Sequence, residues 1–339
     1  MDKILNAAVI GLGVGEKHIE GFNSHPNCIV NKICDFNNEK LNEVSKRFPN
    51  IQLENDPQNI FLDKNIDIIS IASYDNYHAE QVIKSLQNNK HVFVEKPLCL
   101  NRSEFNKIIN VFRSKSNLKI SSNLILRKTA RFEKLRERVY KKKLGDIYLI
   151  EGSYDYGRIH KILNGWRGEL PFYSVTHGGG IHLIDLMMWI TGKKIKSVYA
   201  KGTNIATKNT KFKYFDCVDS LLTFEDGLTG NVISNYPAVI PHGHRLILHG
   251  TLGTFHHGPM GSAYFWDRDK SFVPEYINDP YPGSSKGDII PSFIDSILDE
   301  NIIPIVSSQE VFDTMNVSLA IEESLSNKEE VTIPYCIID

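Results

Sequence analysis

The stretch VIGLGVGEKH, residues 9–18, decides the fold of this chain of 339 residues. It joins an apolar run, which predicts a buried strand, to an amphipathic run, which predicts a helix. Glycines at this junction permit a tight turn and let backbone N–H groups approach a pyrophosphate. The last position of the usual G-x-G-x-x-G pattern is Glu16, so the loop is one residue tighter. Alone, such a cluster is as readily an ordinary turn; opening the first βαβ unit, it predicts a dinucleotide loop made by Gly11, Gly13, Val14 and Gly15.

Apolar runs continue to alternate with amphipathic runs through the first third of the chain. This alternation is typical of βαβ units and a parallel sheet. Residues 1–122 are therefore predicted to form a Rossmann domain, an α/β fold with a doubly wound parallel sheet. The predicted strands lie near residues 7–13, 28–35, 66–73, 91–97 and 118–126, and a helix is predicted at 102–115.

The pattern changes after about residue 122 to longer strands joined by turns. An Asp-Gly pair at 226–227 between apolar runs predicts a hairpin. Helices are expected near 129–142 and 177–192, and the stretch 256–286, rich in Gly, Pro, Tyr and Asp, is expected to be a loop. Residues 123–339 are thus predicted to form an α+β domain with a mostly antiparallel sheet.

Composition excludes several classes of protein. With 39 Lys plus Arg against 40 Asp plus Glu, the formal net charge of −1 argues against a nucleic-acid or anionic membrane partner. No apolar run is long enough to span a membrane, and the N-terminus shows no signal-peptide pattern. The five cysteines are scattered without C-x-x-C spacing, so we expect a reduced, cytoplasmic protein with neither a disulfide scaffold nor a zinc site.

Asp35 ends the second predicted strand, 20 residues after Gly15. A carboxylate at this position can accept hydrogen bonds from both hydroxyls of an adenosine ribose, and it repels a 2′-phosphate. The residues that follow it directly are Phe36, Asn37 and Asn38, with no arginine among them. The sequence therefore favours NAD(H), while Lys40 leaves NADP(H) possible.

Lys96 follows the apolar run of HVFVEKP, residues 91–97, where a core strand emerges. Ligands of doubly wound sheets bind outside the carboxyl ends of the strands. Near a positively charged nicotinamide, a partly desolvated lysine has its pKa lowered from about 10.4. Lys96 could then pass a proton to or from a hydroxyl while hydride moves to the cofactor. Glu95 could hold the amine in place, and Pro97 fixes the turn and can follow a cis bond.

At these residues the chain resembles the Gfo/Idh/MocA oxidoreductases, named for glucose–fructose oxidoreductase and inositol 2-dehydrogenase. The resemblance rests on EKP after an apolar strand, on ASYDNYHAE before it, and on GGGIHLIDLMMWITG at 178–192. It implies a Rossmann domain followed by an open-faced α/β domain that often supports dimers or tetramers, with a substrate cleft between domains. It also implies that Lys96 and His182 are catalytic, that Asp185 contacts substrate, and that Ser73, His78 and Glu95 lie at the cofactor.

One position departs from the resemblance. The family commonly has an Asp one helical turn before the histidine, on the same face, whereas this chain has Gly178. Either His182 lacks its usual partner, or His177 or Tyr173 compensates. His182 is accordingly predicted as the proton-transfer group, with a pocket-lining or helix-packing role as the alternative.

Asn123, Arg127, Trp166 and Arg167 match positions that line the family's cleft, and two of them have a structural alternative. Arg127 could hold a substrate carboxylate or phosphate, or form an interdomain ion pair. An indole at Trp166 could stack on a sugar face or pack in the core. Tyr154 and Tyr156 alternate with period two and so share one face of a strand. The predicted substrate-binding set is Asn123, Arg127, Trp166, Arg167 and Asp185.

These residues predict an NAD(P)-dependent oxidoreductase acting on a secondary alcohol, or its ketone, of a sugar, nucleotide sugar or cyclitol. Two alternatives stay open. One is a non-catalytic NAD-binding regulatory protein, suggested by Gly178. The other is an enzyme that keeps NAD tightly bound and uses transient oxidation for elimination or glycosidic cleavage. Function inferred from a fold resemblance is associational.

Overall fold

The structure, a computed structural model, describes residues 3–115 and 117–338. The chain forms two compact units, and neither is continuous in sequence. The first contains Met1–Ile125, Ser284–Asp313 and Cys336–Asp339. The second contains Leu126–Gly283 and Thr314–Tyr335. The chain therefore passes from the first unit to the second and returns. It crosses again within α10 (Ser308–Asn327) and returns to the first unit after Tyr335.

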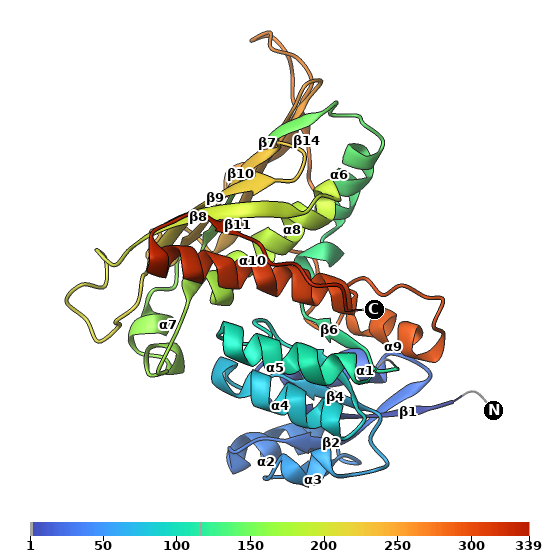
Figure 1. The fold of residues 1–339 in the computed structure, drawn as a ribbon. Coiled ribbons are helices and arrows are strands. Elements are labelled where there is room, and N and C mark those ends of the chain that lie inside the picture. The colour runs from blue at the N-terminus through green and yellow to red at the C-terminus, as the bar shows by residue number, and fades with distance from the viewer. Residues whose placement is uncertain (1–2, 116, 339) are drawn as a thin grey trace. The chain divides into compact units, whose positions relative to one another are not determined.

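The first unit is built on a six-stranded sheet in the order β3-β2-β1-β4-β5-β6, with all described pairs parallel (Figure 1). This is the order of a doubly wound dinucleotide-binding sheet, whose ligand crevice lies where the order reverses, between β1 and β4. The predicted fold of this region is confirmed. The strands are β1 (Leu5–Ile10), β2 (Cys28–Cys34), β3 (Gln52–Glu54), β4 (Ile68–Ile71), β5 (His91–Val94) and β6 (Ile120–Ser122).

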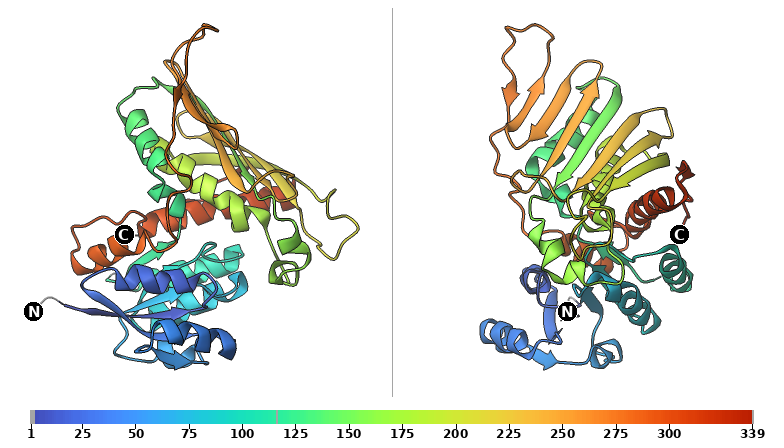
Figure 2. Two further views of the ribbon diagram at one scale, coloured as in Figure 1. Left: turned by 180° about the vertical axis from the view of Figure 1, so that it is seen from behind. Right: turned by 90° about the vertical axis from the view of Figure 1, so that its left-hand side faces the viewer.

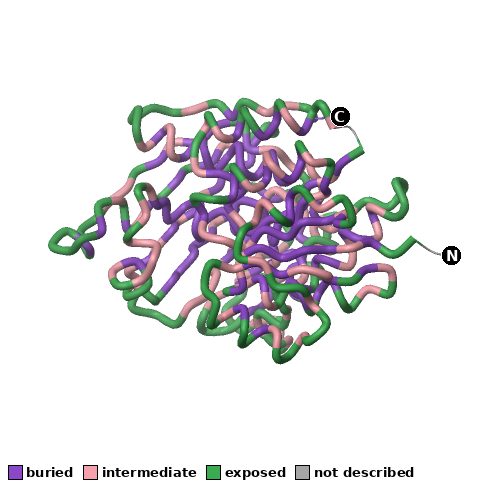
Figure 3. Tube along the Cα trace, turned by 90° about the horizontal axis from the view of Figure 1, so that it is seen from below, coloured by how far each residue is buried: buried purple, intermediate pink, exposed green. Residues whose placement is uncertain are grey.

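Burial explains why these short runs are strands. The central strands β1, β4 and β5 are buried almost throughout, as expected for a parallel sheet covered on both faces (Figure 3). Asparagine caps start two of the covering helices, because the Asn37 and Asn101 side chains accept backbone N–H groups of Lys40 and Glu104. The helices of this unit are α1 (Gly15–Asn23), α2 (Asn38–Arg47), α3 (Gln58–Phe61), α4 (Asp75–Gln87), α5 (Arg102–Arg113) and α9 (Ile290–Leu298).

The second unit carries a nine-stranded sheet in the order β14-β13-β12-β11-β7-β10-β9-β8-β15. The described pairs are antiparallel except β10 with β7, so the prediction of a mostly antiparallel sheet is confirmed. Its strands are β7 (Ile147–Asp155), β8 (Ile195–Thr203), β9 (Cys217–Phe224), β10 (Thr229–Asn235), β11 (Gly243–Gly250), β12 (Thr254–Gly258), β13 (Gly261–Phe265), β14 (Glu275–Tyr276) and β15 (Val331–Thr332).

Helices cover one face of this sheet (Figure 2). A Cβ at Gly152 of β7 would lie 2.6 Å from the Met187 Cε atom, so the glycine lets α8 pack directly on the strand. On β9, Val218, Leu222 and other alternate residues are buried while those between them are not, the pattern of a half-covered sheet. The remaining helical elements are α6 (Ala130–Tyr140), α7 (His160–Leu163), α8 (Ile181–Thr191), η1 (Ile125–Lys128), η2 (Trp166–Gly168) and the π-helical turn η3 (Thr176–Gly180).

Two predictions about local structure are wrong. The stretch 256–286 is not simply a loop, because most of β12 and all of β13 and β14 lie in it. In β12, Phe255 and His257 are buried and the residues between and beside them are less so, which is the alternation of a strand. The strand is short and rich in Gly and His, so this alternation is not evident in the sequence. The predicted strand at 118–126 ends at Ser122 and is followed by η1. In the described part of the chain, no helix is both long enough and apolar enough to cross a membrane.

Candidate functional site

The glycine loop after β1 has a geometry that suits a dinucleotide. Gly11 has φ +87°, and a Cβ there would lie 2.4 Å from the Ala72 carbonyl oxygen. A Cβ at Gly15 would lie 2.8 Å from a Val9 methyl group, so this glycine allows close packing of α1 on the sheet. Gly13 is exposed, and a Cβ there would meet open space, with no heavy atom within 4 Å beyond its chain neighbours. The loop thus leaves open a position where a pyrophosphate can approach the backbone.

Asp35 is fixed at the carboxyl end of β2. One carboxylate oxygen accepts the backbone N–H of Leu12 at 2.7 Å, and the other accepts the backbone N–H of Asn37 at 2.9 Å. Each oxygen keeps a further lone pair, so the carboxylate can also accept ribose hydroxyls. The next residue, Phe36, is 73% exposed, and its ring lies 5.7 Å from that of Tyr74. The residues at this strand end therefore fit an adenosine, with an apolar surface beside the acid.

Four predicted residues share one edge of the first unit's sheet. Because β1, β2, β4 and β5 are parallel, their carboxyl ends lead to Gly11, Asp35, Ser73 and Lys96 at that edge. Lys96 is half-buried, and its peptide bond to Pro97 is cis. The structure therefore places the lysine at the same edge as the glycine loop, as the sequence predicts.

Beneath Lys96 lies a buried polar network. The Glu95 carboxylate is 6% exposed and accepts a hydrogen bond of 2.8 Å from the Asn123 amide. The same amide donates to the Lys286 carbonyl at 2.9 Å. A His18 ring nitrogen lies 3.3 Å from Glu95, and the other lies 2.8 Å from the Ser70 hydroxyl. Asn123, predicted to contact substrate, is thus 1% exposed and engaged with Glu95.

Glu95 is held as an anion by its surroundings. Burial alone would raise the pKa of its carboxyl group, but Lys286, His18 and Lys96 together hold that pKa well below its ordinary value. A buried carboxylate needs such compensation, because an unpaired buried charge is costly. The residue next to Lys96 is therefore a fixed negative charge.

His78 ties two loops of the same edge together. Its ring is fully buried, with one nitrogen 2.7 Å from the Pro97 carbonyl and the other 3.1 Å from the Ser73 carbonyl. The Ser73 hydroxyl donates to Gln81 at 2.7 Å. Both residues predicted to lie at the cofactor are thus found at this edge, with His78 placed as a brace between the loops after β4 and β5.

In the second unit, three consecutive glycines bring the start of α8 onto the sheet. A Cβ at Gly179 would lie 2.3 Å from the Tyr154 ring, and one at Gly180 would lie 2.2 Å from the Ser234 hydroxyl. His182 follows closely and is 8% exposed. Its ring stacks 6.4 Å from that of Tyr154 and lies 6.1 Å from that of His244. The glycines therefore let the backbone before His182 lie close to the sheet.

Gly178 stands where the resemblance implies an aspartate, and a tyrosine fills that space. A Cβ at Gly178 would lie 2.2 Å from the Tyr173 hydroxyl oxygen and 2.6 Å from that of Tyr236. These two hydroxyls hydrogen-bond each other at 2.9 Å. His177 has a ring nitrogen 2.7 Å from the Ser318 hydroxyl of α10. Of the two candidates to compensate, it is Tyr173 that occupies the position, with a neutral hydroxyl pair in place of a carboxylate.

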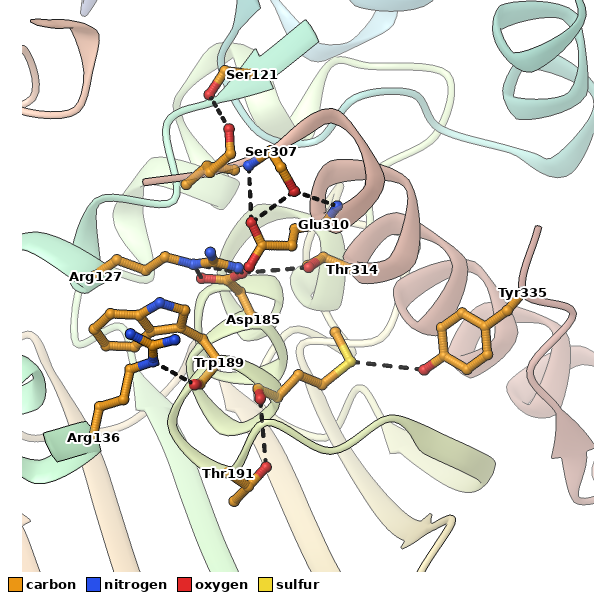
Figure 4. A network of polar contacts seen from close by, with 12 residues as sticks. Ser121, Arg127, Arg136, Asp185, Trp189, Thr191, Ser307, Glu310, Thr314 and Tyr335 are labelled. Carbon is orange, nitrogen blue, oxygen red and sulfur yellow. Dashed lines mark hydrogen bonds and ion pairs between the residues drawn. The ribbon is translucent and has the colours of Figure 1, made fainter. Parts of the chain in front are cut away.

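Arg127 and Asp185 form a buried ion pair inside the second unit (Figure 4). Guanidinium nitrogens lie 2.6 and 3.0 Å from the two carboxylate oxygens, and the side chains are 2% and 1% exposed. The Thr314 hydroxyl adds a contact of 3.4 Å to the carboxylate, and the guanidinium lies 5.7 Å from the Trp189 ring. Both residues are predicted to bind substrate; in this geometry their charges neutralise each other.

Trp166 and Arg167 belong to the short helix η2 and are both half-buried. The guanidinium lies 4.4 Å over the indole ring, a cation–π contact. Tyr154 and Tyr156 stack at 5.8 Å, so the prediction that they share one face of β7 is confirmed.

Comparison with known proteins agrees with this geometry. A family model described as "Oxidoreductase family, NAD-binding Rossmann fold" matches residues 5–123, and one described as "GFO/IDH/MocA C-terminal domain" matches residues 132–256. The chain belongs to the Gfo/Idh/MocA family. It is an NAD-dependent oxidoreductase, and NAD(H), the cofactor favoured by Asp35, is its cofactor.

Relatives of this family member are dehydrogenases of polyols and sugars. It is 24% identical to a myo-inositol 2-dehydrogenase of Thermotoga maritima, over 98% of this chain and 100% of that protein. It is 24% identical to a D-glucoside 3-dehydrogenase of Escherichia coli, over 67% of this chain and 66% of that protein. A solved levoglucosan dehydrogenase with NADH and levoglucosan shares its fold, with TM-score 0.85, 20% identity, and coverage of 98% and 100%.

Several residues of this Gfo/Idh/MocA site are missed by sequence reasoning. The Tyr281 hydroxyl lies 2.5 Å from His244, and burial, followed by the charge of nearby His242, lowers the pKa of His244 to about 3. His244 is therefore a neutral neighbour of His182. The sequence signal is PHGHR, residues 241–245, whose two histidines fit no standard zinc pattern. His18, Lys286 and Tyr236 give no local signal, because their partners are distant in sequence.

Proposed function

We propose that this oxidoreductase transfers hydride between NAD(H) and a secondary alcohol, or its ketone, of a sugar, nucleotide sugar or cyclitol. Bound NAD⁺ supplies the hydride acceptor of such a reaction. The protein must then hold the alcohol and accept its proton. The named relatives act on inositols and a glucoside, which supports a polyol substrate class.

The observation that carries this proposal is Lys96. It emerges at the edge of the sheet that also presents the open position at Gly13 and the carboxylate of Asp35. A lysine there is within the region where a doubly wound sheet binds its ligands. We assign Lys96 the transfer of a proton at the reacting hydroxyl, with Glu95 fixing its position and charge.

His182 is proposed as the second proton-transfer group. Its ring is nearly buried among aromatic side chains, and its neighbour His244 is neutral. The Tyr173 and Tyr236 hydroxyls add no negative charge beside it. We therefore expect His182 to accept or orient a hydroxyl proton. Trp166 and Arg167 remain predicted substrate contacts of the same unit.

The test is binding followed by turnover. NADH fluorescence is titrated with the protein, and the complex is then assayed with a panel of inositols, free sugars, glycosides and nucleotide sugars. Reduction of NAD⁺ with at least one panel member is expected. Failure to bind either dinucleotide at millimolar concentration would reject the proposal.

The same assay separates the two alternatives. A regulatory protein would bind NADH but exchange no hydride with any substrate; Gly178, in place of the implied acid, is the observation that favours it. An enzyme of transient oxidation would copurify with NAD and yield a product with no net redox change. Isotope exchange from deuterated substrate into bound NAD⁺ distinguishes this enzyme from the regulatory protein.

We also propose that the second unit's sheet supports a homodimer or homotetramer in a reduced cytoplasm. Tyr199, Leu221 and Ile247 stand in one row across the sheet face opposite the buried residues of β9, and Leu221 is 51% exposed. All five cysteines are free, three of them buried. Light scattering of wild type and Leu221→Arg tests the assembly; an unchanged mass would contradict this interface.

A further inference from the structure

Glu16 holds two cations of the neighbouring helix. It is the second residue of α1, directly after the glycine loop. Its carboxylate accepts hydrogen bonds from Arg47, and from Lys40 at 3.2 Å, both on α2. The exposed fractions of the side chains are 16% for Glu16, 30% for Lys40 and 45% for Arg47. A glycine loop does not need a carboxylate at this position to bind a pyrophosphate. The triad of Glu16, Lys40 and Arg47 therefore needs a separate explanation.

The triad lies beside the predicted ribose site. α2 begins three residues after Asp35, and the Asn37 side chain that caps it is bonded to the backbone of Lys40. Asp35 itself accepts the backbone N–H of Leu12 in the glycine loop. The loop, the ribose carboxylate and the first turn of α2 are thus linked by hydrogen bonds. Lys40 lies close after the ribose carboxylate in sequence, in the region where a cation of NADP-binding proteins contacts the 2′-phosphate.

Charge supports the geometry. The hydrogen bond from Arg47, with the nearby Lys40, lowers the pKa of Glu16 to about 2. The carboxylate is therefore ionised at every physiological pH and attracts both cations. Lys40 is also bonded to Glu43 at 3.3 Å. Lys40 and Arg47 are thus both paired with acids, although α2 lies next to the predicted cofactor site.

We propose that Glu16 is a specificity-determining residue that withholds Lys40 and Arg47 from the 2′-phosphate of NADP(H). Asp35 excludes this phosphate by repulsion, and Glu16 excludes it by occupying the cations that would otherwise compensate. The chain therefore selects NAD(H) through two acids, one at the end of a strand and one in the first turn of a helix. Sequence patterns show only the first of them. Charge-assisted contacts to phosphate are strong, so releasing the cations should have a measurable effect on binding.

The test measures dissociation constants for NADH and NADPH by fluorescence, without any turnover. Asp35→Ser is the reference background, because it removes the repulsion. In that background, Glu16→Gln is expected to tighten NADPH binding by about ten-fold, the effect of one strong phosphate contact, and to leave NADH binding within about two-fold. Adding Lys40→Gln and Arg47→Gln should abolish the gain.

The matched control is Glu20→Gln on the same helix. Glu20 is paired with Lys17 at 2.9 Å on the exposed side of α1 and acts on Arg47 only as a weaker, longer-range charge, so its removal changes the net charge equally without breaking the hydrogen bonds that Glu16 accepts from Lys40 and Arg47. An equal gain with Glu20→Gln, a change of less than about two-fold with Glu16→Gln, or equal tightening of NADH would each overturn the inference. Melting curves check folding, and Glu16→Ala replaces Glu16→Gln if the latter is unstable. Failure of the wild type to bind both dinucleotides would instead overturn the proposed function.

Discussion

Each unit holds a glutamate largely away from water, and the surroundings shift the pKa values of the two carboxyl groups in opposite directions. Glu95 in the first unit is kept ionised by Lys286, His18 and Lys96. Glu322 in the second unit is bonded to the Ser174 hydroxyl at 2.5 Å, and burial raises its pKa to about 7. One acid has cations around it and the other has a neutral hydroxyl. The cofactor edge thus contains paired charges around Glu95, whereas the second unit combines the neutral hydroxyl pair of Tyr173 and Tyr236 with the buried ion pair of Arg127 and Asp185.

The difference explains how the second unit tolerates Gly178. An aspartate there would add a second acid near Ser174, whose carbonyl accepts the Gly178 N–H at 2.9 Å. The chain instead uses the Tyr173 and Tyr236 hydroxyls, and burial keeps the pKa of Tyr236 well above its ordinary value. The charge pair that α8 makes, Asp185 with Arg127, is internally balanced. His182 itself lies beside the rings of Tyr154 and His244.

The largest expected effect concerns the charged residues at the cofactor edge of the first unit. Lys96→Met should lower kcat by about 10²–10⁴-fold, because it removes the proposed proton-transfer group while keeping a similar volume. NADH affinity should change little. Steady-state NADH formation and fluorescence titration measure the two quantities separately.

The control for this variant is Lys84→Met. Lys84 pairs with Glu80 on the exposed side of α4, so the same substitution there should leave kcat within about two-fold. A Lys96→Met enzyme that retains full turnover would remove Lys96 from the reaction and leave the proposed mechanism without its central residue.

The second prediction concerns the buried ion pair of Arg127 and Asp185. Asp185→Asn leaves Arg127 as a buried cation with a neutral partner and should lower the free energy of unfolding by about 3–5 kcal/mol. The double variant with Arg127→Met should regain a large part of the loss. Urea denaturation measures both. The exposed pair of Lys142 and Asp146 supplies the comparison, since Asp146→Asn should change the free energy of unfolding far less; equal losses at the two sites would contradict the role of burial.

Sequence reasoning predicts the first unit in detail because its signals are local. The loop of Gly11, Gly13 and Gly15, the acid at Asp35 and the lysine at Lys96 each follow a strand, and parallel order alone brings them to one edge. The doubly wound sheet and the cofactor are predicted correctly for this reason. The layer beneath could not be predicted, since His18, Glu95 and Asn123 meet across up to 105 positions of the chain.

In the second unit the signals are long-range, and prediction is weaker. The fold class is correct, but strands between 256 and 286 are missed because turn-forming residues interrupt their alternation. Gly178 stands out from its motif, while Tyr236, whose hydroxyl bonds that of Tyr173 in the space beside Gly178, lies 63 positions from Tyr173. Arg127 has two interpretations from sequence, and only coordinates show that its carboxylate partner is Asp185.

The third prediction concerns the neutral hydroxyl groups beside Gly178 in the second unit. Gly178→Ala should destabilise the fold by about 1–3 kcal/mol, because the new methyl group would overlap the Tyr173 hydroxyl. Gly243→Ala is the matched control: the nearest heavy atom to its Cβ would be 3.9 Å away. Thermal and urea unfolding compare the two. If Gly178→Ala were as stable as Gly243→Ala, the space would not be filled by tyrosine, and an aspartate could be accommodated there.

The smallest expected effect is the pH dependence that Glu322 contributes. Its pKa is about 7 in the folded chain against an ordinary value of 4.5, so between these pH values the folded state binds more protons than the unfolded state. The contribution of Glu322 to stability is therefore complete below pH 4.5 and is lost as the pH rises through 7. Wild type should lose about 1–2 kcal/mol relative to Glu322→Gln over this interval, since the amide keeps the bond from Ser174 but cannot ionise. Urea unfolding of both proteins at about pH 5 and about pH 7.5, on either side of the folded pKa, measures the difference. Parallel pH profiles for the two proteins would mean that Glu322 is already ionised when folded, and the two glutamates would then no longer differ in charge.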